Sequence, residues 1–383
     1  MWRKKYYEHP RRLALAAIAK ETETMTPTIS SALPHLNTTQ SEKMDLGTLP
    51  PLDAARCPRF KATTQTRVFN QDTFDAAIAM PSSVLNIPSD PDKATSTVEK
   101  DKEILARLQS AAASPENLNP STAPRIAVLN MASERNPGGG WLKGASAQEE
   151  ALCFRSTLAA SLHRTLYPIP RRTGLYSRDV AIFRGSVSDG HKLMVPEMDP
   201  ASLPVVSALS VAGIRRPEVK AEGEVAVEAA EGEGAGKTED PKQEAAAGAD
   251  SDNGVPEKQR KHGRPKGKDR TEAPKGPSVF ADPADRELTK DKMRLCLRMA
   301  GTKGHTMLVL GAIGCGAFQN PPQEVAKCWQ EVLSETEFAG GWFKEIWFAV
   351  YDRRNEGNYE IFKEAFDGKV IGEVQLSSTS AES

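Results

Sequence analysis

The segment that most constrains this chain runs over residues 126–162, where an apolar run, a glycine triplet and a helical pattern follow one another. The run Ile126–Leu129 has the length and composition of a buried strand in a parallel sheet. Gly138–Gly140 come next, and after seven further residues Gln148–Glu150 open a segment with leucines at helical spacing. This order predicts an α/β fold with a bare loop at the carboxyl end of a strand, where open sheets bind ligands.

The glycine triplet leaves the backbone without side chains and free to adopt positive φ. A ligand can then approach Gly138, Gly139 and Gly140 closely, and successive N–H groups can form an anion-binding concavity. A glycine triplet alone is typical of a flexible turn. The acidic residues that follow this one favour a ligand site instead.

The two glutamates after the triplet have different interpretations. Ser146 and Glu149 match the Ser-x-x-Glu capping box, so Glu149 is either a helix cap or a functional carboxylate. Glu150 is rotated by roughly 100° from Glu149 about the helix axis. We therefore expect the carboxylates to diverge, unlike the pair that flanks the scissile bond in ordinary glycosidases. If acid–base chemistry occurs here, one glutamate transfers protons and the other positions the substrate.

At this point the residues resemble a family. Gly-Gly-Gly, a spacer of seven and Gln-Glu-Glu look like the signature of poly(ADP-ribose) glycohydrolases, whose fold is a macrodomain. The surrounding sequence, LNMASERNPGGGWLKGASAQEEALCFRS, is most similar to the microbial-type branch. The resemblance covers roughly residues 11–366 apart from an insertion. It implies a three-layer α/β/α domain with a mixed, mostly parallel sheet, without a cofactor or a metal.

The resemblance also implies roles for the residues of the motif. Glu150 would donate a proton to the leaving ribose oxygen, while Glu149 and Gln148 would position ribose hydroxyls. The glycines would pack against the distal ribose and phosphate, and Asn130 would hold a ribose hydroxyl. The acid must keep its proton near neutral pH, and partial desolvation of Glu150 beside Glu149 and substrate phosphates would favour this.

Asp72 follows a strand expected at Gln65–Phe69. By position it resembles the macrodomain aspartate that accepts a hydrogen bond from the adenine amino group. The alternative is a helix N-cap, since a helical pattern starts directly after it.

A second glycine-rich loop, Gly311–Pro322, joins the apolar run His305–Leu310 to a helical segment. Strand, glycine-rich loop and helix form the geometry that seats phosphates on backbone amides. The loop resembles the diphosphate-binding loop of macrodomains. The resemblance implies that the diphosphate binds the backbone amides of Gly314, Cys315, Gly316 and Ala317. It also implies that the ring of Phe318 packs on ribose or adenine. Cys315 is either an activated thiolate or, as we favour, a small residue required beside a phosphate.

Composition divides the rest of the chain. An acidic stretch of Glu, Ala and Gly over Glu218–Asp252 cannot bury enough apolar surface to offset its ordering entropy, so we expect disorder there. We expect an accessory helix (Arg11–Met25) with a loop over residues 1–62. A macrodomain-like catalytic domain follows in two parts, 63–216 and 280–370. A disordered insertion over 217–279 separates these parts, and a flexible tail spans 371–383.

The basic half of the insertion, Lys258–Lys268, contains Gly-Arg-Pro and resembles an AT-hook. Such a segment would lay Arg264 into the minor groove of A·T-rich DNA. The alternatives are a nuclear-import signal or a solubilising segment. We expect the protein to be nuclear, cytoplasmic or both.

Net charge, cysteine usage and hydropathy bear on the class of protein and on its partners. The formal net charge of −1 argues neither for nor against a polyanion partner. Five scattered cysteines without Cys-x-x-Cys spacing argue against a disulfide framework or a zinc site and suit a reducing compartment. We find no apolar run of about 18 residues that would span a membrane. We expect a monomer.

The resulting hypothesis is hydrolysis of the ribose–ribose O-glycosidic bond of poly(ADP-ribose). One alternative is a macrodomain that binds ADP-ribose without turning it over and is tethered to chromatin through Arg264; the complete Gln-Glu-Glu triplet argues against it. A second alternative is a hydrolase acting on mono-ADP-ribosylated protein, which the sequence separates poorly from the first hypothesis.

Overall fold

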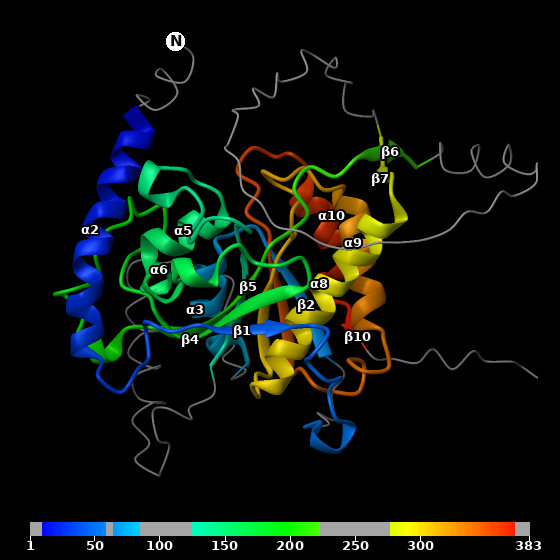
Figure 1. Ribbon diagram of the computed structural model, residues 1–383, viewed down its shortest axis with the longest axis horizontal. Coiled ribbons are helices and arrows are strands. Elements are labelled where there is room, and N and C mark those ends of the chain that lie inside the picture. The colour runs from blue at the N-terminus through cyan, green and yellow to red at the C-terminus, as the bar shows by residue number, and fades with distance from the viewer. Residues whose placement is uncertain (1–9, 59–63, 85–124, 223–275, 372–383) are drawn as a thin grey trace, which may run out of the picture.

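A mixed eight-stranded sheet forms the middle layer of the computed structural model, which describes residues 10–58, 64–84, 125–222 and 276–371 (Figure 1). Its strands are β1 (Glu42–Asp45), β2 (Thr64–Phe69), β3 (Ala127–Met131), β4 (Thr173–Ala181), β5 (Val205–Val211), β8 (Met307–Leu310), β9 (Glu345–Ala349) and β10 (Val370–Ile371). The order is β1-β4-β5-β3-β8-β9-β2-β10. The central run from β5 to β2 is parallel, and β4, β1 and β10 pair antiparallel at the two sides. The expected mixed, mostly parallel sheet is confirmed.

Helices cover both faces of this sheet (Figure 1). One face carries α2 (Pro10–Ala32), α3 (Thr73–Val84), α5 (Gln148–Arg155) and α6 (Leu158–Ser161), and the other carries α8 (Pro283–Thr302), α9 (Pro322–Leu333) and α10 (Asn358–Phe366). Short 3-10 helices lie between them: η1 (Ala54–Arg56), η2 (Trp141–Lys143), η3 (Arg164–Leu166) and η4 (Pro200–Ser202). The chain is therefore a three-layer α/β/α structure.

The central strands are apolar on both faces because each face lies under helices. In β3, Ala127 and Leu129 enter the core beneath α8 and α9, and Val128 enters the core beneath α3 and α5. This alternation follows from the two-residue period of a strand. It directs the carboxyl ends of β3 and β8, with both glycine-rich loops, to one edge of the sheet.

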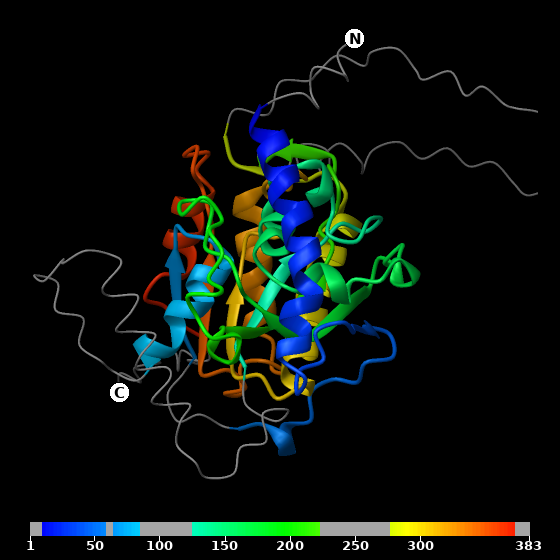
Figure 2. The same cartoon turned by 90° about the vertical axis from the view of Figure 1, so that its left-hand side faces the viewer.

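The N-terminal helix is longer than expected. We expected a helix over Arg11–Met25 and a loop from Thr26 onward, whereas α2 continues to Ala32. The extension is stabilised because Thr26 and Ile29 continue the buried face of the helix. Figure 2 shows α2 lying along the molecule, with α5 and α6 behind it. The segment after it adds β1, which the sequence did not predict, to the edge of the sheet beside β4.

Two further boundaries differ from expectation. The turn-rich connection expected at Tyr167–Tyr176 already contains the start of β4, where Thr173 pairs with Asp45 of β1. The single helix expected over residues 151–162 is divided into α5 and α6. The helix breaks at Ser156, which is extended and forms an isolated bridge with Ile182.

The insertion expected over 217–279 has structured ends. Val219–Ala221 (β6) pairs antiparallel with Ser278–Phe280 (β7), at the upper right of Figure 1. The predicted disordered segment is therefore a few residues too long at each end. Residues 223–275, with Arg264 and the basic segment 258–268, lie outside the described residues, as does the helix expected at 104–113.

No helix in the described ranges is long and apolar enough to cross a membrane. The same ranges contain no group of three or more His, Cys, Asp or Glu side chains that could hold a metal ion. All five cysteines are free thiols.

Candidate active site

The two glycine-rich loops start beside each other because β3 and β8 are adjacent parallel strands, with Ala127 opposite Leu308. A Cβ built on Gly311 would lie 3.2 Å from Cε of Met131, so the last residue of β3 lies next to the first residue after β8. This edge, outside the carboxyl ends of the strands, is the usual ligand site of an open α/β sheet.

Glu150 is held between the glycine triplet and the start of α5. Its Oε1 accepts a hydrogen bond from Gly140 N at 2.8 Å, and its Oε2 accepts one from Ala147 N at 2.9 Å. The contact with Ala147 is the side-chain half of a capping box, so Glu150 and not Glu149 makes it. The predicted Ser146–Glu149 box is one residue out of register because Ala147 is the N-cap of α5.

Glu149 points into the protein beside the end of β3. Its Oε2 accepts a hydrogen bond from Ser133 N at 2.7 Å, and its buried Oε1 has no partner among the described residues. Burial raises the pKa of Glu149 to about 8, the charge of Glu150 adds to the rise, and the Ser133 N–H opposes it. Glu149 is therefore a carboxyl that holds a proton at neutral pH.

Both carboxylates meet at Gly139, contrary to the expectation that they diverge. A Cβ at Gly139 would lie 2.5 Å from Oε1 of Glu150 and 3.0 Å from Oε2 of Glu149. Helix geometry separates adjacent positions on the cylinder, but both flexible side chains turn back toward amides of the same preceding loop. Gly139 also has φ of 61°, so a side chain at this position would be both strained and obstructed.

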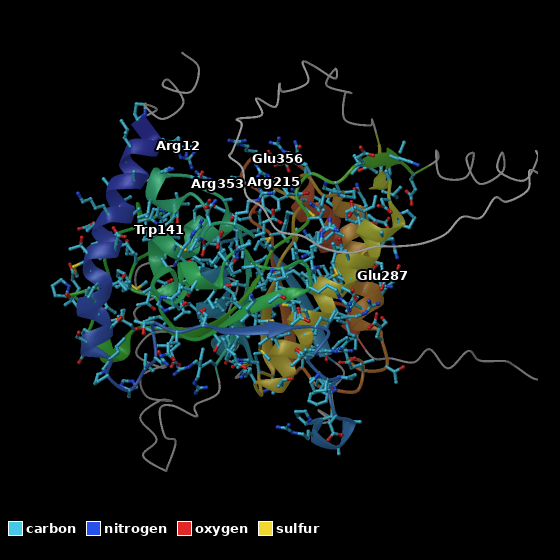
Figure 3. The ribbon with its side chains drawn as sticks, viewed as in Figure 1. Arg12, Trp141, Arg215, Glu287, Arg353 and Glu356 are labelled. Atoms are coloured by element: carbon cyan, nitrogen blue, oxygen red, sulfur yellow. The ribbon has the colours of Figure 1, made fainter. Side chains whose placement is uncertain are left out.

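The outer side of the glycine triplet packs on aromatic and helical residues. A Cβ at Gly138 would lie 2.7 Å from Cδ1 of Trp141 and 3.0 Å from Sγ of Cys153. The Arg12 side chain of α2 donates to Lys143 O at 3.1 Å and 3.3 Å, which attaches the N-terminal helix to this loop. Figure 3 places Arg12 and Trp141 on the same side of the molecule.

Gln148 has a different role from the one implied by the resemblance. Its Oε1 accepts from Met131 N at 2.8 Å, and its Nε2 donates to Leu129 O at 2.7 Å and to Thr73 Oγ1 at 3.1 Å. Since both ends of the amide are engaged, Gln148 joins α5 to β3 and α3. It does not present a free group to ribose hydroxyls in this structure.

Three buried polar atoms near the glutamates lack partners in the described part of the chain: Oδ1 of Asn130, Oε1 of Glu149 and the hydroxyl of Tyr167. Asn130 uses only its Nδ2, which donates to Ser210 Oγ at 2.9 Å. Burial raises the pKa of Tyr167, and the charge of Glu149 adds to the rise. Sequence reasoning missed Tyr167 because no motif marks its position.

Asp72 caps α3 and pairs with the buried Arg155. Its Oδ1 accepts from Phe74 N at 2.8 Å, and the same oxygen pairs with the Arg155 guanidinium. Arg155 also binds Asp75 at 2.7 Å. Of the two interpretations offered for Asp72, the N-cap describes its contacts here. Arg155, which the sequence analysis did not single out, connects the end of α5 to this cap.

The second loop is only partly as expected. Gly314 has φ of 78°, and a Cβ there would lie 2.6 Å from the Asn320 side chain. Cys315 N donates to Ala312 O at 3.1 Å, so this amide is already engaged, and burial raises the pKa of the Cys315 thiol, contrary to an activated thiolate. Of the four amides from Gly314 to Ala317, only that of Cys315 has an acceptor among the described residues, and Gly316 and Ala317 are exposed. Phe318 is half-buried.

The fold and this edge of the sheet define a macrodomain-like α/β/α protein with two buried carboxyls against a glycine triplet. Residues 12–187 match the family model described as the catalytic domain of microbial-type PARG, the poly(ADP-ribose) glycohydrolases. This part of the chain is similar to the catalytic domain of the microbial-type PARG family.

Solved structures agree in fold. The chain is similar to poly(ADP-ribose) glycohydrolase from Thermomonospora curvata, with 22% identity, 94% of this chain and 100% of that chain covered, and a TM-score of 0.54. It is also similar to the enzyme from the same organism bound to the inhibitor ADP-HPD, with 22% identity, the same coverage and a TM-score of 0.52. A comparison with curated proteins found no significant match.

Proposed function

We propose that this protein is a poly(ADP-ribose) glycohydrolase, which hydrolyses the ribose–ribose O-glycosidic bond of poly(ADP-ribose) and releases ADP-ribose. The observation that carries the proposal is the meeting of Glu149 and Glu150 at Gly139, inside the residues that match the catalytic domain of the family. A protein that only binds ADP-ribose does not need two carboxyls buried at this position.

Glu150 is the proposed general acid and base. With the phosphates of the substrate nearby, which favours the protonated carboxyl, Glu150 transfers a proton to the ribose oxygen that leaves, and the bond from that oxygen to the anomeric carbon breaks. The oxocarbenium-like ribose is stabilised by the adjacent diphosphate. A water then adds to the anomeric carbon and returns a proton to the same carboxylate, which restores the enzyme. The amides of Gly140 and Ala147 hold the carboxyl in place during both steps.

Glu149 is the proposed positioning residue for the distal ribose. Because it holds a proton at neutral pH, it can donate a hydrogen bond to a ribose hydroxyl. The partnerless Oδ1 of Asn130 and hydroxyl of Tyr167 supply an acceptor and a donor beside it. A ligand that satisfied these three atoms would remove the cost of burying them unpaired.

The rest of ADP-ribose is assigned to the neighbouring loops. The amides of Gly314, Gly316 and Ala317 would bind the diphosphate, and Phe318 would pack on ribose or adenine. Phe74 N and Arg155 use the same oxygen of Asp72, which leaves Oδ2 for an adenine amino group.

The test is incubation of the purified protein with auto-poly(ADP-ribosyl)ated substrate beside Glu150→Gln. Loss of a general acid costs about 10²–10⁴-fold in rate, so the variant should release at least that much less ADP-ribose. Turnover at the wild-type rate in Glu150→Gln would overturn the assignment of the acid. If the wild type bound ADP-ribose without turning it over, the protein would be an ADP-ribose-binding macrodomain and not a hydrolase.

Mono-ADP-ribosylated protein in the same assay distinguishes a mono-ADP-ribosyl hydrolase. Contact of the segment 258–268 with A·T-rich DNA, nuclear or cytoplasmic location and a monomeric state remain hypotheses from the sequence. Comparing the affinity of the full chain and its Arg264→Ala variant for an A·T-rich duplex tests the first of these.

A further inference from the structure

A cavity of about 260 Å³ opens beside the candidate active site, at the carboxyl end of β5. Its walls come from four places: the two residues after Ser133, the loop that precedes β4, the residues that follow β5, and α8. No role in the proposed reaction has been given to any residue of this cavity.

The charged side chains of the lining are mostly cationic. The lining contains one carboxylate, Glu134, and four cationic side chains, those of Arg135, Arg171, Arg215 and Lys292. Glu134 is already paired with Arg135 at 3.0 Å. The guanidinium groups of Arg171 and Arg215 have no ion-pair or hydrogen-bond partner in the part of the chain that the structure describes. Arg215 is labelled in Figure 3. The cavity therefore has an excess of positive charge without a counterion from the protein.

Lys292 is the buried cation of the cavity, with only 5% of the residue exposed. Its ammonium group donates one hydrogen bond, to Arg171 O at 2.5 Å. An ammonium group has three donors, and the described residues supply no second acceptor. Burial lowers the pKa of Lys292 to about 8, and the charge of Arg171 adds to the effect. An anion in the cavity would supply both an acceptor and a compensating charge.

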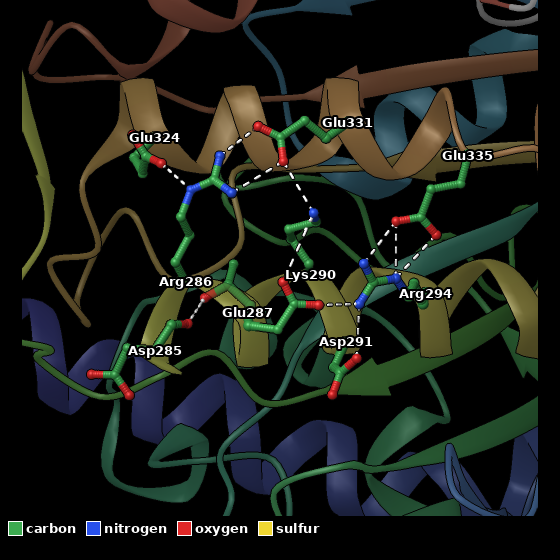
Figure 4. Close-up of polar contacts among 10 residues, drawn as sticks. Asp285, Arg286, Glu287, Lys290, Asp291, Arg294, Glu324, Glu331 and Glu335 are labelled. Atoms are coloured by element: carbon green, nitrogen blue, oxygen red, sulfur yellow. Dashed lines mark hydrogen bonds and ion pairs between the residues drawn. The ribbon is translucent and has the colours of Figure 1, made fainter. Parts of the chain in front are cut away.

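The position of Lys292 is fixed by the attachment of α8 to α9. Arg294, two positions further along α8, binds Glu335 through Nη2 at 2.8 Å, and Arg286 pairs with Glu324 and Glu331 (Figure 4). These contacts use the side of α8 that faces α9. They hold the helix while leaving the Lys292 side chain in the cavity wall.

The cavity shares a wall with the second glycine-rich loop. Asn320 Nδ2 donates to Ile214 O at 2.6 Å and to Gly314 O at 3.1 Å, and Arg216 N donates to Phe318 O at 2.8 Å. On its other side the cavity begins at Glu134, directly after Ser133, whose N–H binds Glu149. An anion in the cavity would thus lie next to the region assigned to the scissile bond.

We propose that this cavity is a second phosphate subsite, which binds the diphosphate of the ADP-ribose unit on the leaving side of the scissile bond. The inference rests on the proposed function. Each unit of the polymer carries a diphosphate, so a chain whose terminal unit occupies the active site presents another diphosphate beyond the cleaved bond. Unpartnered guanidinium groups suit this ligand because they bind phosphate oxygens in pairs.

The test compares two substrates in the full-length protein: poly(ADP-ribose), and an ADP-ribosyl compound whose leaving group carries no phosphate. The variant is Arg171→Ala with Arg215→Ala. The matched control is Arg172→Ala, which removes a neighbouring exposed arginine that pairs with Asp291 at 3.0 Å. All the changed side chains are exposed, so the melting temperature should remain near that of the wild type.

For the double variant we expect kcat/KM on the polymer to fall about ten- to hundred-fold, mainly through KM. We expect little change on the compound whose leaving group carries no phosphate. Arg172→Ala should retain wild-type values on both. Equal loss on both substrates, or no loss on the polymer, would overturn the subsite. Wild-type protein that hydrolyses neither substrate would instead refute the proposed function.

Inorganic pyrophosphate distinguishes a polymer from a free anion as the occupant. Pyrophosphate bound at a leaving-side subsite should inhibit hydrolysis of the polymer more strongly than hydrolysis of the compound whose leaving group carries no phosphate. The double variant should lose this difference. If pyrophosphate binds the cavity but the double variant hydrolyses the polymer normally, the site takes a free anion and the polymer subsite is wrong.

Discussion

Replacing Glu149 by glutamine should change the pH dependence of stability. In the unfolded chain this carboxyl ionises near 4.5, whereas in the folded protein burial raises its pKa to about 8. Between these values the folded state binds more protons than the unfolded state, so Glu149 lowers the stability of the fold progressively as pH rises through this window. Glutamine stays neutral and keeps an oxygen for the Ser133 N–H.

The size of the effect follows from the pKa difference. At 1.36 kcal/mol per pKa unit, the full cost of Glu149 above pH 8 is about 4–5 kcal/mol, of which about 2 kcal/mol is already present at pH 6. The gain in stability from Glu149→Gln should therefore increase by about 2–3 kcal/mol between pH 6 and pH 9. For a domain of this size that corresponds to roughly 5–10 °C in the difference between the two melting temperatures.

Thermal unfolding of the wild type and the variant at several pH values measures this directly. Glu364→Gln, at an exposed position of α10, controls for the general effect of removing a carboxylate. A gap between wild type and Glu149→Gln that stays constant from pH 6 to pH 9 would show that Glu149 is not protonated in the folded protein. The proposed hydrogen bond from Glu149 to a ribose hydroxyl would then be wrong as well.

Two other substitutions test the geometry of the site. Gly139→Ala places a methyl group 2.5 Å from Oε1 of Glu150 at a residue with positive φ. We therefore expect the free energy of unfolding to fall by about 1–3 kcal/mol and turnover to be lost. A fully active and stable variant would contradict the arrangement of the carboxyls around this glycine. Tyr167→Phe removes a buried hydroxyl without a partner in the described chain, so it should leave the melting temperature unchanged or higher while raising KM. An unchanged KM would exclude Tyr167 from the ribose contacts.

Much of the architecture was readable from local pattern. The apolar run before Asn130 and the one before Gly311 both form parallel strands, because a strand buried on both faces is apolar throughout. Helix α9 begins at Pro322, where the helical segment after the second glycine-rich loop was expected. The similarity of residues 12–187 to the family model was also readable, because the motif that carries it is contiguous in sequence.

Other features depend on residues distant in sequence. The extension of α2 beyond Met25 and the pairing of β1 with β4 arise from tertiary burial, which overrides the loop-like composition of Thr26–Ala62. The engagement of Gln148 with β3 likewise appears only when helix and strand are packed together.

The order of strand, glycine triplet and acidic helix start was determined by the sequence alone, since backbone freedom and helical periodicity are properties of neighbouring residues. Only the tertiary structure decided which glutamate caps the helix, which one keeps its proton, and that Tyr167 and Lys292 lie buried without a full set of partners. These outcomes depend on desolvation and on hydrogen bonds between separate segments. The free energies of both are set by what surrounds a side chain in space.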